Sequence, residues 1–323
     1  MFKTTCFILF TFLSANLFAQ IIVEDDLKNL LKDSTNSNEK KSSLTLSIGA
    51  GNGVFSKKNN SLNADQSVLN KIFYTTTADY YNKSGLGLTL NSTFVPENGV
   101  MNFYQTALSP SYYYNTKDIY TGISYTHFFT TKNTKIDVNP FKDEVSGSFK
   151  WLKSLIRPGI QMVYSNGMSK ESFDTSYIVN NPPPPHVVHE VGTVTSKIND
   201  FTVSLSADHK FNFERLFFKE DELSFIPSIA LNAGSNKNST KSSTNFSTIR
   251  KKKLASTKRS RTGSYNQSFA IQSIAISTDF YYSIDKFFIE PEFYADYYLH
   301  TIAHGTNYKR LATIFSLTAV INF

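Results

Sequence analysis

The sequence predicts an all-β fold, a transmembrane antiparallel up-and-down β-barrel of about 12 strands. Three observations predict it: apolar and polar residues alternate along many segments, most of these segments are long, and the connections between them alternate between short and long. The chain of 323 residues is 40% hydrophobic with a mean hydropathy of −0.26. It therefore lacks the repeated apolar runs of roughly 20 residues that membrane helices need. Its 15% aromatic content excludes a disordered chain, because disordered chains are poor in aromatics.

The first element is a targeting segment. Lys3 gives a positive start, residues 6–13 (CFILFTFL) form an apolar core, and Ala19 precedes Gln20. This pattern predicts a secretory signal peptide over residues 1–19. Its removal takes away the single cysteine of the chain, so the mature protein is indifferent to an oxidising compartment. Residues 20–42 are expected to form an N-terminal periplasmic segment, with a plug inside the barrel as the alternative, and residues 43–323 form the barrel.

The strands are recognised by a period of two. In residues 201–213 the odd positions are apolar apart from His209, and none of the even positions is apolar. A strand with one apolar and one polar face has this pattern. Twelve segments are predicted, most of them longer than the average soluble strand of roughly 5–6 residues: 43–55, 70–82, 85–95, 101–115, 118–131, 144–153, 154–168, 197–213, 222–235, 268–283, 286–300 and 310–323.

A β-sandwich would show the same alternation, but the connections and the aromatics favour a barrel in a membrane. Most connections on one side are short, whereas residues 56–69, 132–143, 169–196 and 236–267 form long ones, as in outer-membrane barrels with short periplasmic turns and long outer loops. Aromatic residues gather where strands meet the short turns, as in Tyr80-Tyr81, Tyr112-Tyr113-Tyr114, Phe211 and Phe213, Tyr281-Tyr282 and Phe287-Phe288. Such residues are expected to form an interfacial girdle.

The last strand carries a resemblance. Residues 319–323 (AVINF), with alternating apolar residues back to Leu311, resemble the C-terminal strand of Gram-negative outer-membrane β-barrel proteins, and the Ala19-Gln20 boundary resembles Bacteroidota signal peptides. The resemblance implies localisation in the cell outer membrane, contact with its lipid and lipopolysaccharide, and recognition by the barrel-assembly machinery. In that family the terminal Phe, here Phe323, is part of the assembly signal.

The basic residues gather in one predicted outer loop. The net charge is +7; it falls to +6 when Lys3 leaves with the leader, and the nine bases and no acids of residues 236–267 leave −3 for the remainder. Seven of these bases lie close together in sequence: Arg250, Lys251, Lys252, Lys253, Lys258, Arg259 and Arg261. A solvated loop and a loop that binds lipopolysaccharide phosphates or another anionic partner both fit this charge. Nucleic acid is excluded as a partner by the secretory leader.

A second set of charges is predicted inside the barrel. If the apolar face of each strand faces lipid, the polar face lines the lumen. This places there Glu290, Glu292, Asp296, Asp279, Arg157, Lys150, Asp208, Lys210 and Arg310, together with His300. Such charges fit a structural ion-pair network or a constriction that selects solutes. Glu290 and Glu292 also share one face, as an acid/base pair of an enzyme would.

Catalytic and metal-binding patterns are weak. His186 and His189 have a spacing that metal ligands use, but no cysteine or carboxylate cluster completes a site, so no metal and no cofactor is expected. A lipid hydrolase needs a Ser–His pair on the lipid face. His127 is predicted to face lipid, whereas Ser146 and Ser148 on the next strand are predicted to face inward.

The function expected from these observations is porin-like passive diffusion of small solutes, without enzymatic activity. Two alternatives remain open: a non-conducting barrel whose outer loops bind surface glycolipid or a partner, and, with less support, a membrane-embedded lipid hydrolase.

Overall fold

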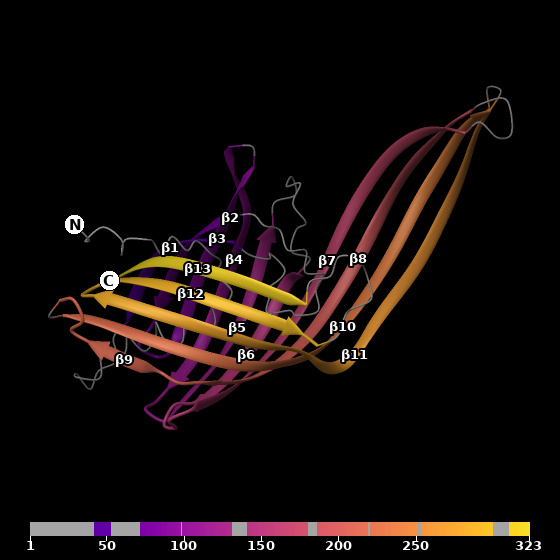
Figure 1. Cartoon of the computed structure of the whole chain (residues 1–323). Helices are drawn as coiled ribbons and strands as arrows, with labels where there is room; N and C mark the ends of the chain where they lie inside the picture. The colour runs from indigo at the N-terminus through magenta and orange to yellow at the C-terminus, as the bar shows by residue number, and fades with distance from the viewer. Residues whose placement is uncertain are drawn as a thin grey trace, which may run out of the picture.

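The chain forms a closed antiparallel β-barrel in a computed structural model, which describes residues 42–52, 72–97, 99–130, 141–179, 186–218, 220–250, 253–299 and 310–323 (Figure 1). The strands of the described residues are β1 (Ser43–Asn52), β2 (Ile72–Tyr81), β3 (Leu86–Glu97), β4 (Val100–Asn115), β5 (Ile119–Thr130), β6 (Phe141–Trp151), β7 (Arg157–Val179), β8 (His186–Asp208), β9 (Phe211–Glu214), β10 (Asp221–Arg250), β11 (Lys253–Ile284), β12 (Phe287–Tyr298) and β13 (Leu311–Asn322). No helix of these residues is long and apolar enough to cross a membrane.

Apart from the four-residue β9, each strand pairs with the next strand in sequence, β8 pairs with β10, and β13 returns to β1. The seam between β13 and β1 runs from Thr45↔Asn322 to Asn52↔Phe315. The four-residue β9 pairs with β10 next to the end of β8, so β9 continues the line of β8. When these two are counted as one strand, the closed ring contains 12 strands. The predicted all-β fold and 12-stranded barrel are therefore confirmed. Closure leaves no barrel edge unpaired, which the hydrocarbon layer requires.

The alternation predicted from the sequence separates the two faces of the wall. In β13, Ala312, Ile314 and Ser316 are buried inside, whereas Leu311, Leu317 and Ile321 are exposed on the outside. The same holds around the ring, where exposed leucine, isoleucine, valine and aromatic side chains cover the outer face. Since exposed apolar surface of this extent is unfavourable in water, the outer face is the lipid-facing face.

Short turns join the strands at the end where β1 begins and β13 ends. The turn between β2 and β3 needs Gly85, whose φ is +94° and whose missing Cβ would lie 2.2 Å from the Tyr113 carbonyl oxygen. The longer connection from β9 to β10 is ordered by Asp221, because its Oδ2 accepts hydrogen bonds from the amides of Phe217 and Phe218 and from the Tyr282 hydroxyl.

The predicted strand 197–213 is interrupted in the structure. β8 ends at Asp208 and β9 begins at Phe211, and the break lies beside Pro227 of β10, whose carbonyl accepts a hydrogen bond from the His209 amide at 3.3 Å. Pro227 has no N–H to donate to a neighbouring strand, which explains the gap in the ladder.

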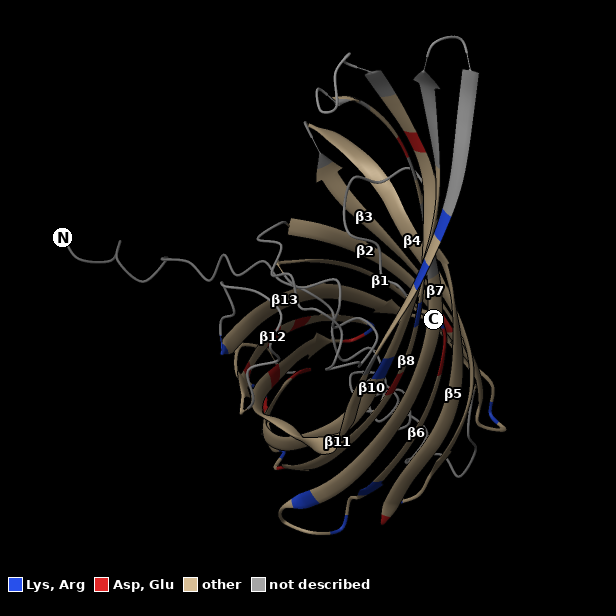
Figure 2. Ribbon diagram, turned by 90° about the vertical axis from the view of Figure 1, so that its right-hand side faces the viewer, with Lys and Arg blue, Asp and Glu red and all other residues tan. Residues whose placement is uncertain are grey.

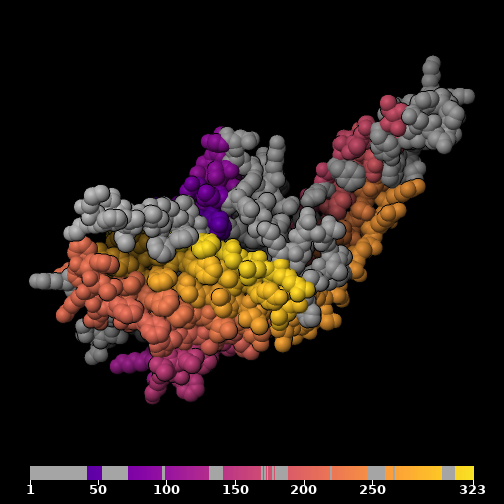
Figure 3. Space-filling model, in the orientation of Figure 1, coloured from indigo at the N-terminus to yellow at the C-terminus, as the bar shows by residue number. Residues whose placement is uncertain are grey.

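Two predicted outer loops are wrong. Most of residues 169–196 and 236–267 belong to β7, β8, β10 and β11, which run 23, 23, 30 and 32 residues. β7 pairs with β6 only as far as Phe141↔Gly167, and β11 with β12 only as far as Ser273↔Tyr298. Beyond the row Met168–Lys197–Ser239–Ser264 the four strands leave the barrel together as a curved sheet, here called the arm: residues 168–179, 186–197, 239–250 and 253–264 (Figures 1 and 3).

The arm escaped prediction because its sequence lacks a regular alternation of apolar and polar residues. Residues 236–249 (NKNSTKSSTNFSTI) show no alternation, since neither face meets lipid or a core. Backbone hydrogen bonds to β8 on one side and β11 on the other hold β10 in the sheet. Threonine, which is frequent here, favours extended backbone.

The predicted aromatic girdle is half correct. Tyr80, Tyr112, Tyr114, Phe211, Phe213 and Phe287 are exposed on the outer face, but Tyr81, Tyr113, Tyr281 and Phe288 are buried inside the barrel. Adjacent residues in a strand face opposite sides, so a run of aromatics cannot lie wholly in the interface.

Several predictions fall outside the described residues. These are the signal peptide (1–19), the N-terminal segment apart from Ser42, the regions 56–69 and 132–140, and Lys251, Lys252 and His300.

Candidate functional site

The inner wall of the barrel carries the charged residues that the sequence singled out. Seven of the nine are buried on the inner face: Glu290, Glu292, Asp296, Asp279, Arg157, Lys150 and Asp208. Lys210 is half-buried in the break between β8 and β9, and Arg310 is exposed at the outer end of β13, where its carbonyl accepts a hydrogen bond from the Tyr298 amide. These two therefore lie off the strand faces that line the lumen.

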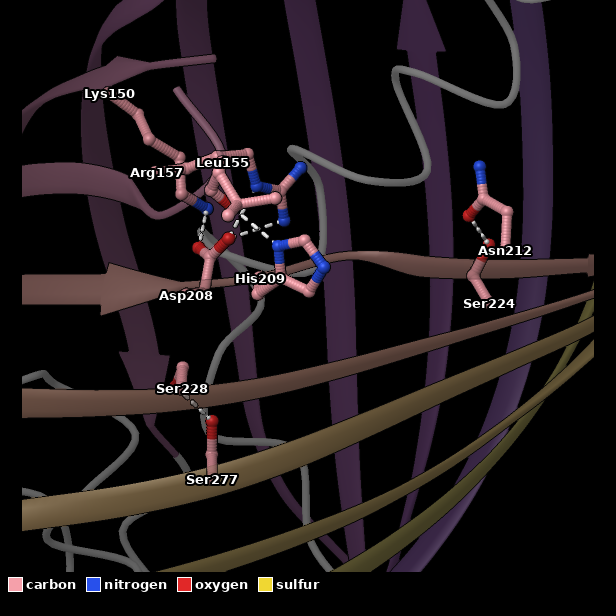
Figure 4. A network of polar contacts seen from close by, with 9 residues as sticks. All are labelled: Lys150, Leu155, Arg157, Asp208, His209, Asn212, Ser224, Ser228 and Ser277. Carbon is pink, nitrogen blue, oxygen red and sulfur yellow. Dashed lines mark hydrogen bonds and ion pairs between the residues drawn. The ribbon is translucent and has the colours of Figure 1, made fainter. Parts of the chain in front are cut away.

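The two basic residues of this set converge on one carboxylate. Asp208 Oδ2 lies 2.6 Å from Lys150 Nζ, and its Oδ1 lies 2.5 Å from both Nε and Nη2 of Arg157 (Figure 4). The three side chains are almost fully buried. Buried charges of this kind persist only when they are paired, so the cluster offsets much of its own desolvation.

The lysine side chain passes a glycine on its way to Asp208. Lys150 is on β6 and Asp208 on β8, so the lysine side chain must cross β7. It crosses at Gly159, its register partner, where an added Cβ would lie 3.5 Å from Lys150 Cγ and 2.8 Å from Ser206 Oγ. Arg157 is the direct partner of Asp208 across the β7–β8 ladder.

Carboxylates gather on the wall formed by β11 and β12. Asp279 and Glu292 are directly opposed across the ladder, and Ser316 Oγ of β13 donates a hydrogen bond of 2.6 Å to Glu292 Oε2. Glu290 and Asp296 lie on the same inner face of β12, and Asp296 is 0% exposed. The acids and the two bases are therefore on different parts of the wall.

Sequence reasoning missed further lumen carboxylates, Glu144 and Asp200 among them. Glu144 accepts a 2.9 Å hydrogen bond from Ser165 Oγ. Asp200 accepts one of 3.1 Å from Thr202 Oγ1 and one of 3.3 Å from Asn236 Nδ2. Both residues are in phase with inward positions of their own strands, so strict use of the two-residue period would have found them.

The inner wall also carries apolar and aromatic groups. Phe73, Val95, Tyr104, Ala275, Tyr294 and Ile314 form one buried cluster. Near the short turns, the Tyr113 ring stacks on Tyr120 with centroids 5.6 Å apart and lies 6.0 Å from Tyr81. Gly87 and Gly122 leave room for these rings, because a Cβ there would meet Tyr81 or Tyr113 within about 2.5 Å. The lumen is thus lined by polar and aromatic patches together.

The serines and the histidine weighed for a lipid hydrolase lie on opposite faces of the wall. Ser146 is buried inside and shares a 2.7 Å hydrogen bond with Ser124. His127 lies on the outer face, where its Nδ1 is 2.7 Å from Asp143 Oδ1, and the same oxygen accepts a 2.6 Å hydrogen bond from the Tyr125 hydroxyl. Among the described residues, no serine is hydrogen-bonded to His127, Asp143 or Tyr125.

A Ser–His–Asp arrangement does occur on the arm. Ser176 Oγ is 2.7 Å from His189 Nδ1, and His189 Nε2 is 3.5 Å from Asp174 Oδ1. The imidazole and the carboxylate are 47% and 66% exposed. A catalytic triad keeps its carboxylate buried and hydrogen-bonded, so this exposed set does not meet that requirement. Within the described residues, no group of three or more His, Cys, Asp or Glu could hold a metal ion.

The predicted basic residues cluster around the tip of one hairpin of the arm. Arg250 ends β10 and Lys253 begins β11, and Lys251 and Lys252 lie between them, outside the described residues. Arg259 and Arg261 are exposed. The side chains of Arg250, Lys253 and Lys258 are outside the part that the structure describes.

No family model and no curated protein matches the chain. Similar solved structures include a bacterial polysaccharide outer membrane secretin (9% identity, TM-score 0.34, covering 88% of this chain and 98% of that one) and the outer membrane channel DcaP of Acinetobacter baumannii (7%, 0.22, 87% and 96%). A third is an anion-selective porin from Comamonas acidovorans (8%, 0.22, 87% and 98%). At this level of similarity they carry no argument about this chain's solutes or partners.

The location follows from the chain's own structure. A closed 12-stranded barrel with an apolar outer face and a polar inner face suits the bacterial outer membrane, where such barrels reside. The protein is an outer-membrane β-barrel.

Proposed function

We propose that the protein is a passive channel for small polar solutes that prefers cations to anions. The charge of the inner wall carries the proposal. Among the buried charged side chains described on the inner face, seven are carboxylates (Glu144, Asp200, Asp208, Asp279, Glu290, Glu292 and Asp296) and two are basic (Lys150 and Arg157). Both bases are engaged with Asp208.

The physical reason is electrostatic focusing. Walls of low dielectric constant concentrate the field of the carboxylates in a narrow passage, which raises the local concentration of cations and excludes anions. The acids on β11 and β12 are the main source of this field, since Asp208 is paired with both Lys150 and Arg157 and the charges of these three side chains sum to +1.

Conductance in planar bilayers tests the proposal. The wild-type protein is expected to pass K⁺ about tenfold better than Cl⁻ in a salt gradient. The triple variant Glu290→Gln, Glu292→Gln, Asp296→Asn should lose most of this preference and keep its conductance. Asp118→Asn is the matched control, because it removes an exposed carboxylate from a short turn, 3.8 Å from Lys153. A folded barrel that never conducts, or a triple variant with unchanged selectivity, would refute the proposal.

A second candidate function is favoured by the arm: a barrel that need not conduct and whose outer part binds surface glycolipid or a partner. A shortened protein separates the two candidates. Replacing residues 170–195 and 241–262 by Asn-Gly turns joins the paired residues Ser169 and Ser196, and Thr240 and Gly263. Loss of glycolipid or partner binding with unchanged conductance supports the second candidate. Loss of conductance with unchanged binding speaks against the second candidate.

A further inference from the structure

The outer face of β7, β8, β10 and β11 changes from apolar to polar at one level. Residues opposed across these four strands form rows. From the short turns toward the arm, the rows on the outer face are apolar as far as the row Met162, Val203, Ala233 and Ile271. Tyr164, Phe201 and Phe269 follow, with the rings of Phe201 and Phe269 6.2 Å apart. An aromatic row at the end of an apolar band marks the membrane–water interface. The Tyr164 hydroxyl crosses this level and donates to Asn199 Oδ1 at 3.3 Å.

Four lysines occupy the three rows directly above this aromatic level. The first row is Asn166–Asn199–Lys237–Asn266, the second Met168–Lys197–Ser239–Ser264, and the third Lys170–Thr195–Lys241–Thr262. Residues opposed in an antiparallel ladder share a face, so all four lysines lie on the face that continues the lipid-facing wall. All four are exposed, and none is within salt-bridge distance of a carboxylate of the described residues. Lys and Arg segments are visible where the arm leaves the barrel (Figure 2).

The lysines are close together although they are distant in sequence. Lys197 is the diagonal neighbour of Lys170 on one side and of both Lys237 and Lys241 on the other. Diagonal neighbours on one face of a sheet are about 7–8 Å apart, so three ammonium groups surround that of Lys197 within reach of shared phosphate oxygens. Like charges at this spacing repel one another unless an anion lies between them.

The arginines of the predicted basic loop lie on the other face. Arg259 and Arg261 are opposed to Thr244 and Ser242 of β10, whose even-numbered residues continue the inner wall. The register of the sheet therefore divides the bases of residues 236–267 and joins Lys237 and Lys241 to two lysines of the other hairpin.

We propose that this lysine face binds the phosphate groups of an acylated, phosphorylated glycolipid of the outer leaflet, the lipid A part of lipopolysaccharide. The acyl chains would lie against the apolar rows below Phe201 and Phe269, and the phosphates would lie among the four ammonium groups. The height of the cluster just above the aromatic level and its continuity with the lipid-facing wall favour a membrane lipid over a soluble anion. The inference gives the second candidate function its ligand and residues, and it is independent of conduction.

Binding of lipid A to the full-length protein folded in detergent tests the proposal. The double variant Lys197→Gln, Lys241→Gln should bind bis-phosphorylated lipid A about thirtyfold more weakly than wild type, because each basic residue near an anionic surface contributes about 1 kcal/mol. The matched control Arg259→Gln, Arg261→Gln removes the same charge from the other face and should change affinity less than about twofold. Conductance and ion selectivity of the lysine variant should equal those of wild type, which separates this test from that of the pore.

Further ligands test whether the site needs the phosphates of a lipid, and a rescue variant tests whether it needs the charge. Dephosphorylated lipid A should bind poorly, and neither inorganic phosphate nor heparin should compete at concentrations equal to that of the glycolipid. Lys197→Arg, Lys241→Arg should retain binding, which shows that charge and not a folding defect is responsible. Equal loss in the arginine control, unchanged affinity in the lysine variant, or heparin binding as tight as lipid A would overturn the proposal.

Discussion

Strands β7, β8, β10 and β11 each contribute one segment to the barrel wall and one to the arm, yet different forces hold the two segments in β-structure. On β8, the barrel segment alternates between buried Thr202 and exposed Leu205, because one side meets the lumen and the other meets lipid. The arm segment of β8 shows no such alternation, since Val188 and Val191 lie on opposite faces, and it depends on backbone pairing with β7 and β10. The contrast teaches that side-chain alternation reports the environment of a strand and not the presence of a strand. Substitutions should therefore be costly in the wall and nearly neutral in the arm.

The largest difference is expected between two carboxylates. Asp208→Asn leaves Lys150 and Arg157 buried without their counter-charge and should lower the free energy of unfolding by about 3–5 kcal/mol. Asp174→Asn on the arm removes an exposed partner of His189 and should change it by less than about 1 kcal/mol. Urea unfolding in detergent–phospholipid micelles measures both. Equal effects would show that the ion cluster contributes nothing beyond a surface pair.

A smaller difference is expected between two outward positions of β8. Leu205→Arg introduces a charge on the lipid-facing wall and should destabilise the barrel by about 2–4 kcal/mol. Thr193→Arg lies on the same face of the same strand, 12 residues away on the arm, and should cost about 0–0.5 kcal/mol. Unfolding in lipid vesicles is the measurement. A cost at Thr193 as large as that at Leu205 would place the arm in the membrane.

The smallest difference is expected between two glycines. An added Cβ at Gly122 would lie 2.3 Å from Tyr113 Cδ1, and the Tyr113 ring is held by Tyr120 and Tyr81, so Gly122→Ala should cost about 1–3 kcal/mol. No atom lies within 4 Å of such a Cβ at Gly263 on the arm. Gly263→Ala should therefore stabilise the arm by about 0.5 kcal/mol through lower chain entropy. Hydrogen exchange of β11 amides measures the second effect, and faster exchange in the variant would contradict it.

The site was predictable to the extent that it depended on single strands. The two-residue period placed Glu290, Glu292 and Asp279 on the inner face, and the same rule, applied without exception, would have added Glu144 and Asp200. It failed where the pattern ended: Lys210 lies in a break beside Pro227, and Arg310 precedes its strand. It also failed for Tyr81 and Tyr113, because a run of aromatics was assigned to one interface although neighbours in a strand face opposite sides.

The sequence by itself determined the barrel, the number of its strands and the polarity of its two faces, because those properties follow from alternation along each strand. Only the tertiary structure decided which distant residues meet. It brought Lys150 across Gly159 to Asp208, and it placed Lys170 and Lys197 beside Lys237 and Lys241. These groupings depend on the register between strands and on the closure of the ring. The register is set by the turns and by the matching of the apolar faces of neighbouring strands, so the sequence of one strand alone does not specify it.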